Sequence, residues 1–169
     1  HRGPDKQKIW LDDRIGLGNV MLHTTPEALH EELPCYDSEA QVALVADARI
    51  DNRDELLATF DYGCRDAVLV SDSSLILTAY KKWGVNCCDH LLGDFAVDIL
   101  DKRERRVVLL RDHFGVKPLY YYSSDKIFAF ASEIKAFLAL PQVSLEINEE
   151  HVADFLMFQD DGKSTGFKG

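Results

Sequence analysis

The order of the expected strands and helices is the feature that most restricts how this chain can fold. Strand-like patterns occur at residues 14–23, 41–46, 95–101, 105–111, 119–123 and 127–131. Two helical patterns separate the second strand from the third, and two more follow the last strand. The last four strands follow one another as hairpins, so strands and helices do not alternate as they do in a doubly wound fold. The order therefore predicts an α+β fold with largely antiparallel sheets.

The expected elements carry specific boundaries and inward-facing residues. The first strand should turn Ile15, Leu17 and Met21 inward, and a long polar connection should follow it at 24–40. A short helix should begin after an N-cap at Asp51 and run through Phe60, and a second should begin after an N-cap at Asp72 and end at Gly84. Two further helices are expected over 133–140 and from about 148 to 158.

Composition excludes several classes of protein. The chain has 169 residues, enough for one globular domain, and its formal net charge of -10 disfavours nucleic-acid binding. No uncharged run approaches the length of a membrane span, and no secretory segment is present, so we expect a cytoplasmic location and no membrane contact. The cysteines are Cys35, Cys64, Cys87 and Cys88. Their spacing does not predict zinc binding, so we expect reduced thiols and no metal.

Two familiar nucleotide-binding motifs fail when their spacing is checked. The segment 162–165, Gly-Lys-Ser-Thr, resembles the end of a P-loop, but Met157 stands where the motif needs its first glycine. The segment 16–18, Gly-Leu-Gly, begins like a dinucleotide fingerprint, but Met21 takes the place of the third glycine. The residues alone therefore reach no further than an acidic α+β domain.

Several motifs together resemble the N-terminal glutaminase domain of asparagine synthetase, a class II glutamine amidotransferase. They occur in the family's order and cover nearly the whole chain: HRGPD at 1–5, GLG at 16–18, DARIDN at 47–52, SD at 71–72, LGDFA at 92–96, RDHFGVKPLYY at 111–121 and ASEIKA at 131–136. The segment 111–121 is the most specific of them. Its residues also have structural explanations: a turn at Gly115, a strand launched at Lys117-Pro118, and pairing of Arg111 with Asp112.

The resemblance implies an N-terminal nucleophile hydrolase-like fold, a four-layer αββα sandwich with two antiparallel sheets. It places a glutamine amidotransferase-like domain at 1–145, lacking its N-terminal strand and nucleophile. Residues 146–169 would begin the linker toward an ATP-dependent synthetase domain of the same chain, which would be the partner of this domain. No cofactor is expected in this domain, whereas ATP and Mg²⁺ are expected in the synthetase domain. A homodimer is compatible with the sequence, and the oligomeric state is left open.

The resemblance also assigns roles to four positions of the glutamine pocket. Asp72 matches the carboxylate that holds the substrate ammonium, although a helix cap alone would also explain it. Met21 matches the arginine that clamps the substrate carboxylate, and it carries no charge. Asp47 and Ala48 match the Asn-Gly pair of the oxyanion hole, where an ionised aspartate would repel the developing negative charge. In the family an N-terminal cysteine is the nucleophile, and none of the cysteines here matches it.

Three functions follow from these positions. The first is the glutaminase domain of a glutamine-dependent asparagine synthetase, which passes ammonia to aspartate. The second is a non-hydrolysing structural domain of an amide-bond-forming enzyme similar to β-lactam synthetases or lasso-peptide cyclases. The third is a docking module without enzymatic activity. Because three pocket positions depart from the family pattern, we predict that the domain does not hydrolyse glutamine and that glutamine binding is doubtful.

Overall fold

The computed structural model describes residues 2–62, 69–144, 146–159 and 164–168. These residues fall into two compact units, His1–Lys117 and Pro118–Gly169. The functional boundary expected between residues 145 and 146 stays a prediction, and residue 145 itself lies outside the described residues.

A four-stranded antiparallel sheet organises the first unit. Its spatial order is β3 (Cys35–Asp37), β4 (Val42–Ile50), β5 (Gly93–Asp101) and β6 (Arg106–Arg111). The register of β4 with β5 runs from Val42 opposite Asp101 to Ile50 opposite Gly93. The hairpin predicted at 95–101 and 105–111 is confirmed, and the strand predicted at 41–46 is longer than expected. The 24–40 connection contains η1 (Glu27–His30) and β3, neither of which was predicted.

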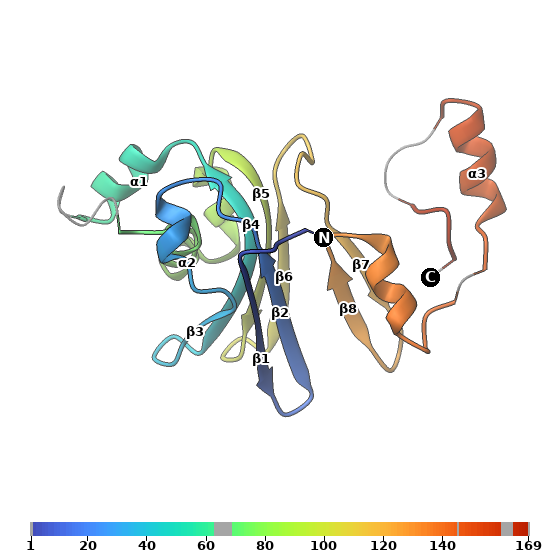
Figure 1. Cartoon of the computed structure of the whole chain (residues 1–169), viewed down its shortest axis with the longest axis horizontal. Coiled ribbons are helices and arrows are strands. Elements are labelled where there is room, and N and C mark those ends of the chain that lie inside the picture. The colour runs from blue at the N-terminus through green and yellow to red at the C-terminus, as the bar shows by residue number, and fades with distance from the viewer. Residues whose placement is uncertain (1, 63–68, 145, 160–163, 169) are drawn as a thin grey trace. The chain divides into compact units, whose positions relative to one another are not determined.

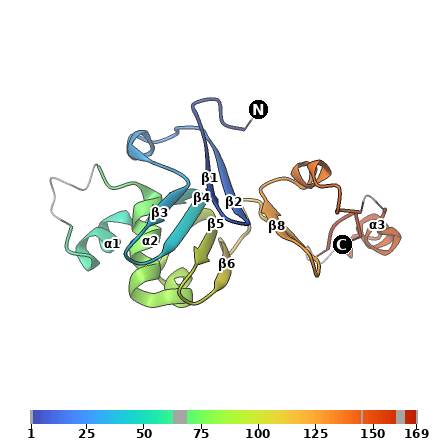
Figure 2. The same ribbon diagram turned by 90° about the horizontal axis from the view of Figure 1, so that it is seen from below.

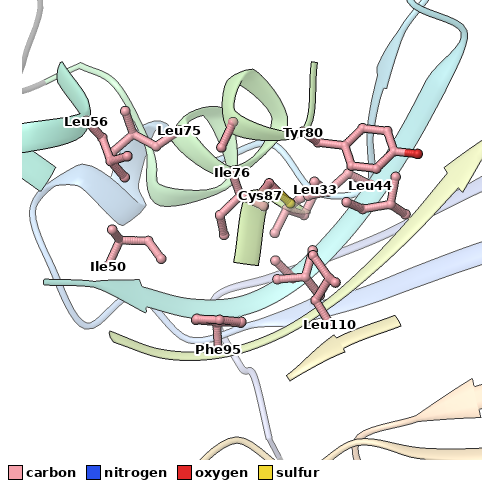
Figure 3. Close-up of a cluster of buried hydrophobic side chains, with 14 of the residues drawn as sticks. Leu33, Leu44, Ile50, Leu56, Leu75, Ile76, Tyr80, Cys87, Phe95 and Leu110 are labelled. Carbon is pink, nitrogen blue, oxygen red and sulfur yellow. The ribbon is translucent and has the colours of Figure 1, made fainter. Parts of the chain in front are cut away.

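One face of this sheet is covered by the helices (Figures 1 and 2). They are α1 (Arg53–Thr59), α2 (Asp72–Trp83) and the following 3-10 helix η2 (Gly84–His90). Side chains at alternate positions of β4 and β5 meet the apolar side of α2, so one buried cluster joins sheet and helices. Figure 3 shows its centre, with Leu33, Leu44, Ile50, Leu56, Leu75, Ile76, Tyr80, Cys87, Phe95 and Leu110 pointing toward one another.

The opposite face of the sheet is met by a two-stranded hairpin (Figures 1 and 2), formed by β1 (Lys6–Asp12) and β2 (Ile15–Met21). Trp10 lies against Tyr36 of β3, with ring centroids 5.3 Å apart. Asn19 donates its side-chain N–H to the carbonyl of Ala46 at 3.3 Å. Leu17 and Met21 are buried as predicted, whereas the prediction for Ile15 was wrong because its side chain is exposed near the turn.

Both expected N-caps are displaced by one residue. The N-cap of α2 is Ser71, whose hydroxyl accepts the N–H of Ser74, so the prediction of Asp72 as the cap was wrong. Asn52 precedes α1 without a side-chain capping bond, and Asp51 instead accepts the side chain of Arg49 at 3.0 Å. The Asp72 carboxylate is therefore available for a role other than capping.

The second unit contains a hairpin and two short helical segments. The hairpin of β7 (Tyr120–Ser123) and β8 (Phe128–Ala131) agrees with the prediction. The segment expected as a helix over 133–140 is the 3-10 helix η3 (Ile134–Ala139), and α3 spans Glu149–Leu156 with Asn148 as its cap. The described residues thus form one four-stranded and two two-stranded antiparallel sheets. This is the mixed α+β architecture that was predicted, and the four-layer sandwich remains an expectation.

Candidate functional site

The strand β4 carries both positions that match the oxyanion hole. Asp47 is half-buried and forms an ion pair with Lys117, whose Nζ lies 2.6 Å from Oδ1. Arg2 approaches the other carboxylate oxygen at 3.4 Å. Ala48 follows on the strand and lies opposite Phe95 of β5. The carboxylate of Asp47 is thus neutralised by cations of the same chain, and its side chain offers acceptors where the family has an amide donor.

The loop 111–117 holds Lys117 in place. The Asp112 carboxylate accepts the N–H groups of Val116 at 2.8 Å and of Lys117 at 2.9 Å. Arg111 donates to the carbonyls of Gly115 at 2.7 Å and Lys117 at 2.9 Å, and Gly115 has a φ of 64°. The expected pairing of Arg111 with Asp112 was wrong, because each side chain binds loop backbone instead. The expected turn at Gly115 is confirmed.

Met21 lies at the end of β2, beside Gly3 and Asp5 of the HRGPD motif. A side chain at Gly3 would meet the backbone of Val20 and Met21 at 2.4 Å, so only glycine allows this approach. The N–H of Asp5 donates to the carbonyl of Met21 at 3.2 Å. The Met21 side chain is buried in the apolar cluster. It therefore supplies packing at a position where a carboxylate clamp would need charge.

Asp72 is the most deeply buried of the predicted site residues that carry charge, with 8 % of its surface exposed. Its Oδ2 accepts the N–H of Ile50 at 3.2 Å, and its Oδ1 accepts a guanidinium N–H of Arg53. The second terminal nitrogen of Arg53 donates to the carbonyl of Val70 at 2.6 Å. Burial raises the pKa of Asp72, and the contacts with Ile50 and Arg53 oppose that rise.

Glu31 is a half-buried acid near Asp72 that the sequence did not indicate. Its Oε1 accepts the N–H of Ser73 at 2.9 Å, so a carboxylate lies at the positive end of α2. Burial raises the pKa of Glu31, while its hydrogen bonds to Ser73 lower it. The only sequence signal for this residue was its position in a polar connection, which does not identify a partner 42 residues away.

The backbone brings the four predicted positions to one end of the first unit. Asp47 and Ala48 precede Ile50 on the same strand, and Ile50 holds Asp72. The HRGPD segment joins the other two, because Arg2 contacts Asp47 while Gly3 lies on Met21. The partners that sequence reasoning missed are Arg53 and Glu31, since nothing in a linear pattern pairs them with α2.

The other candidate groups do not form a second site in the described part of the chain. Burial raises the thiol pKa of Cys35 and Cys87 to about 11, so neither is a ready thiolate nucleophile. Cys64 and half of the P-loop-like segment, Gly162 and Lys163, lie outside the described residues. Where the structure is described, no group of acidic, histidine and cysteine side chains is arranged to hold a metal. No described helix is long and apolar enough to cross a membrane.

Comparison with known proteins agrees with the motifs. The sequence model of the family described as "Glutamine amidotransferase domain" matches residues 1–167. The chain is 27% identical over 154 residues to asparagine synthetase [glutamine-hydrolyzing] 3 of Bacillus subtilis, covering 90% of this chain and 25% of that protein. It is 32% identical over 162 residues to asparagine synthetase B [glutamine-hydrolyzing] of Escherichia coli, covering 95% and 28%.

A third relative is named an amidase and not an asparagine synthetase. The amidase chyE of Penicillium rubens is 32% identical over 143 residues, which cover 82% of this chain and 20% of that protein. The chain thus spans 20% to 28% of the length of these three relatives. The match of the family model over nearly all residues, in a fold with antiparallel sheets and the motifs in order, shows that the chain belongs to the glutamine amidotransferase domain family, related to the N-terminal domains of asparagine synthetases.

Proposed function

We propose that this domain is the amidotransferase-type part of an asparagine synthetase-like, ATP-dependent amide ligase, and that it does not hydrolyse glutamine. The observation that carries the second statement is the ion-paired carboxylate of Asp47. Hydrolysis of an amide develops negative charge on the carbonyl oxygen, which needs N–H donors placed in advance. The Asp47 carboxylate has only acceptor oxygens and no N–H to offer at that position.

Two further positions support the loss of hydrolysis. Met21 is buried among apolar side chains and has no charge with which to hold an α-carboxylate. Asp72 already accepts a guanidinium of the same chain. The polar contacts that a free amino acid would need are therefore missing at one position and already used at another.

The ligase assignment is supported by the names of the bacterial relatives, which are glutamine-hydrolysing asparagine synthetases. In this proposal ATP and Mg²⁺ bind to a synthetase domain of the same polypeptide, which activates a carboxylate for attack by an amine or ammonia. The acceptor is aspartate in asparagine synthetases. An acceptor in a β-lactam synthetase-like or cyclase-like reaction is the second candidate, because the pocket departures resemble that branch.

The test is glutamate release from L-glutamine by the purified full-length protein, with and without ATP and Mg²⁺. We expect no glutamate above the enzyme-free rate, with the Escherichia coli asparagine synthetase B as the positive control. Glutamate release that disappears when an N-terminal cysteine of the full-length protein is replaced would contradict the proposal. ATP-dependent AMP release on addition of candidate carboxylates with ammonium or an amine then identifies the acceptor.

A further inference from the structure

Arg53 and Asp72 form a partly buried ion pair between the starts of α1 and α2. Their side chains are 18% and 9% exposed. The guanidinium uses one nitrogen for Asp72 Oδ1 and another for the carbonyl of Val70 at 2.6 Å. The second carboxylate oxygen is held by the N–H of Ile50. The Asp72 carboxylate and the Val70 carbonyl thus both accept hydrogen bonds from the Arg53 guanidinium.

The helix α1 does not by itself favour an arginine at the position of Arg53. Arg53 is the first residue of α1, where the helix dipole disfavours a positive charge, and the acidic residues Asp54 and Glu55 follow it as that dipole predicts. The contact with Asp72 offsets this unfavourable place. The guanidinium is therefore held by the carboxylate and the Val70 carbonyl, as a bound ligand would be.

We infer that Arg53 fills, from within the chain, a cation site that a free amino acid would otherwise occupy, so that the site is occluded rather than lost. The identity of the excluded ligand rests on the proposed function. The occlusion itself rests on the contacts alone. The carboxylate is anchored by Ile50 independently of Arg53, so removing the Arg53 side chain should leave a vacant anionic site. The ammonium of an amino acid can bind the Asp72 carboxylate alone, whereas the carboxylate and the Val70 carbonyl together match the planar fork of a guanidinium, so guanidinium should bind the vacant site more tightly than a simple ammonium.

The inference is tested by chemical rescue in the full-length protein. Arg53→Ala leaves the buried Asp72 without its cation, and we expect Tm to fall on the order of 10 °C. Guanidinium chloride at low millimolar concentration should then raise the Tm of Arg53→Ala in a saturable way, compared with sodium chloride at equal ionic strength. Methylammonium chloride should raise it less. Hydrogen exchange of the α2 amides gives the matching local readout.

Two variants control for general salt effects. Arg53→Ala combined with Asp72→Asn removes the anionic acceptor and should show no rescue. Arg49→Ala removes a neighbouring arginine whose pair with Asp51 is exposed, so its Tm should change little and guanidinium should have no effect. If Arg53→Ala does not fold, Arg53→Met keeps the apolar stem and is titrated instead.

Three results would overturn the inference. They are an unchanged Tm in Arg53→Ala, equal rescue in the Asp72→Asn double variant, and a saturable guanidinium response of the wild-type protein, which would mean that the site is not filled. None of these depends on glutamate release. Failure here is therefore distinguishable from failure of the proposed function.

Discussion

Asp98 is an acidic side chain that is buried among apolar residues. It lies on β5, opposite Val45 and Leu109 of the neighbouring strands, and 8% of its surface is exposed. Its Oδ1 has no hydrogen-bond partner among the described residues. Burial raises its pKa to about 7, so the carboxyl group is largely protonated below neutral pH.

This burial predicts a stability that falls as pH rises. Asp98 titrates near 3.8 in the unfolded chain and near 7 in the folded chain, so the folded state binds the proton more tightly. The proton-linked stabilisation is complete below pH 3.8 and is lost as pH rises through 7, a change of up to about 4 kcal/mol. In Asp98→Asn this loss should disappear, so the free energy of unfolding of the variant should rise relative to that of the wild type between pH 4 and pH 8. Urea unfolding at the two pH values measures the difference.

The exposed Asp54 provides the control for that measurement. Asp54→Asn removes the same charge from the surface of α1 but leaves Asp98 in place, so the loss of stability due to Asp98 between pH 4 and pH 8 should persist in this variant. A profile in Asp98→Asn that is parallel to wild type would show that Asp98 does not titrate in this range.

Ser71 allows the capping and pairing roles at the start of α2 to be separated. Ser71→Ala removes the bond to the N–H of Ser74 and should cost about 1 kcal/mol. Asp72→Asn keeps that cap but removes the carboxylate that pairs with Arg53, and should cost about 3 kcal/mol or more. Chemical denaturation of both variants makes the comparison. Equal losses would contradict the assignment of the cap to Ser71.

At the scale of elements, the loop 111–117 depends on one glycine. A Cβ at Gly115 would lie 2.6 Å from the Arg111 guanidinium, and its φ of 64° strains any residue with a side chain. Gly115→Ala should therefore destabilise the protein by about 2 kcal/mol and loosen the backbone contacts of Arg111. Thermal unfolding measures the loss. Gly18→Ala, where no atom lies within 4 Å of the added Cβ, should change stability far less.

Sequence patterns predicted the strands and helices whose own residues show a clear hydrophobic pattern. The strands β5 and β6 are rich in β-branched and other apolar residues on either side of a short charged turn, so the hairpin between them was recognisable. The strand β1 mixes Lys6 and Lys8 with apolar residues that remain exposed, and β3 has only three residues, so neither gives a clear period. Ser71 and Asp72 are both good capping residues, and only the position of the helix decides between them.

For the candidate site, the roles assigned to the four positions stay predictions, and the structure shows only where these residues lie and what they contact. Family resemblance placed Met21, Asp47, Ala48 and Asp72, and the structure brings them to one end of the unit. Their present partners are set by packing between distant segments: Lys117 contacts Asp47 across 70 residues of sequence, and Arg53 contacts Asp72 across 19. No local pattern reports such pairs, because each depends on how the whole sheet and its helices are arranged.

At the scale of the whole molecule, burial is concentrated in the first unit. Every residue of the main apolar cluster lies between Met21 and Leu110, whereas Phe137 is the only buried hydrophobic side chain among the described residues of the second unit. A chain of residues 1–117 should therefore unfold cooperatively, and residues 118–169 alone should lack fixed structure. Circular dichroism melts of both fragments check this. A cooperative transition in 118–169 would contradict it.

The two tryptophans lie in different layers of the first unit, and this gives the molecule two separate optical reporters. Trp10 lies in the β1–β2 hairpin beside Tyr36, and Trp83 at the end of α2 stacks on His90 with ring centroids 4.0 Å apart. The emission of Trp10→Phe then follows the helical layer alone, and that of Trp83→Phe follows the hairpin alone. Loss of the two signals at different denaturant concentrations would resolve the order in which the layers separate.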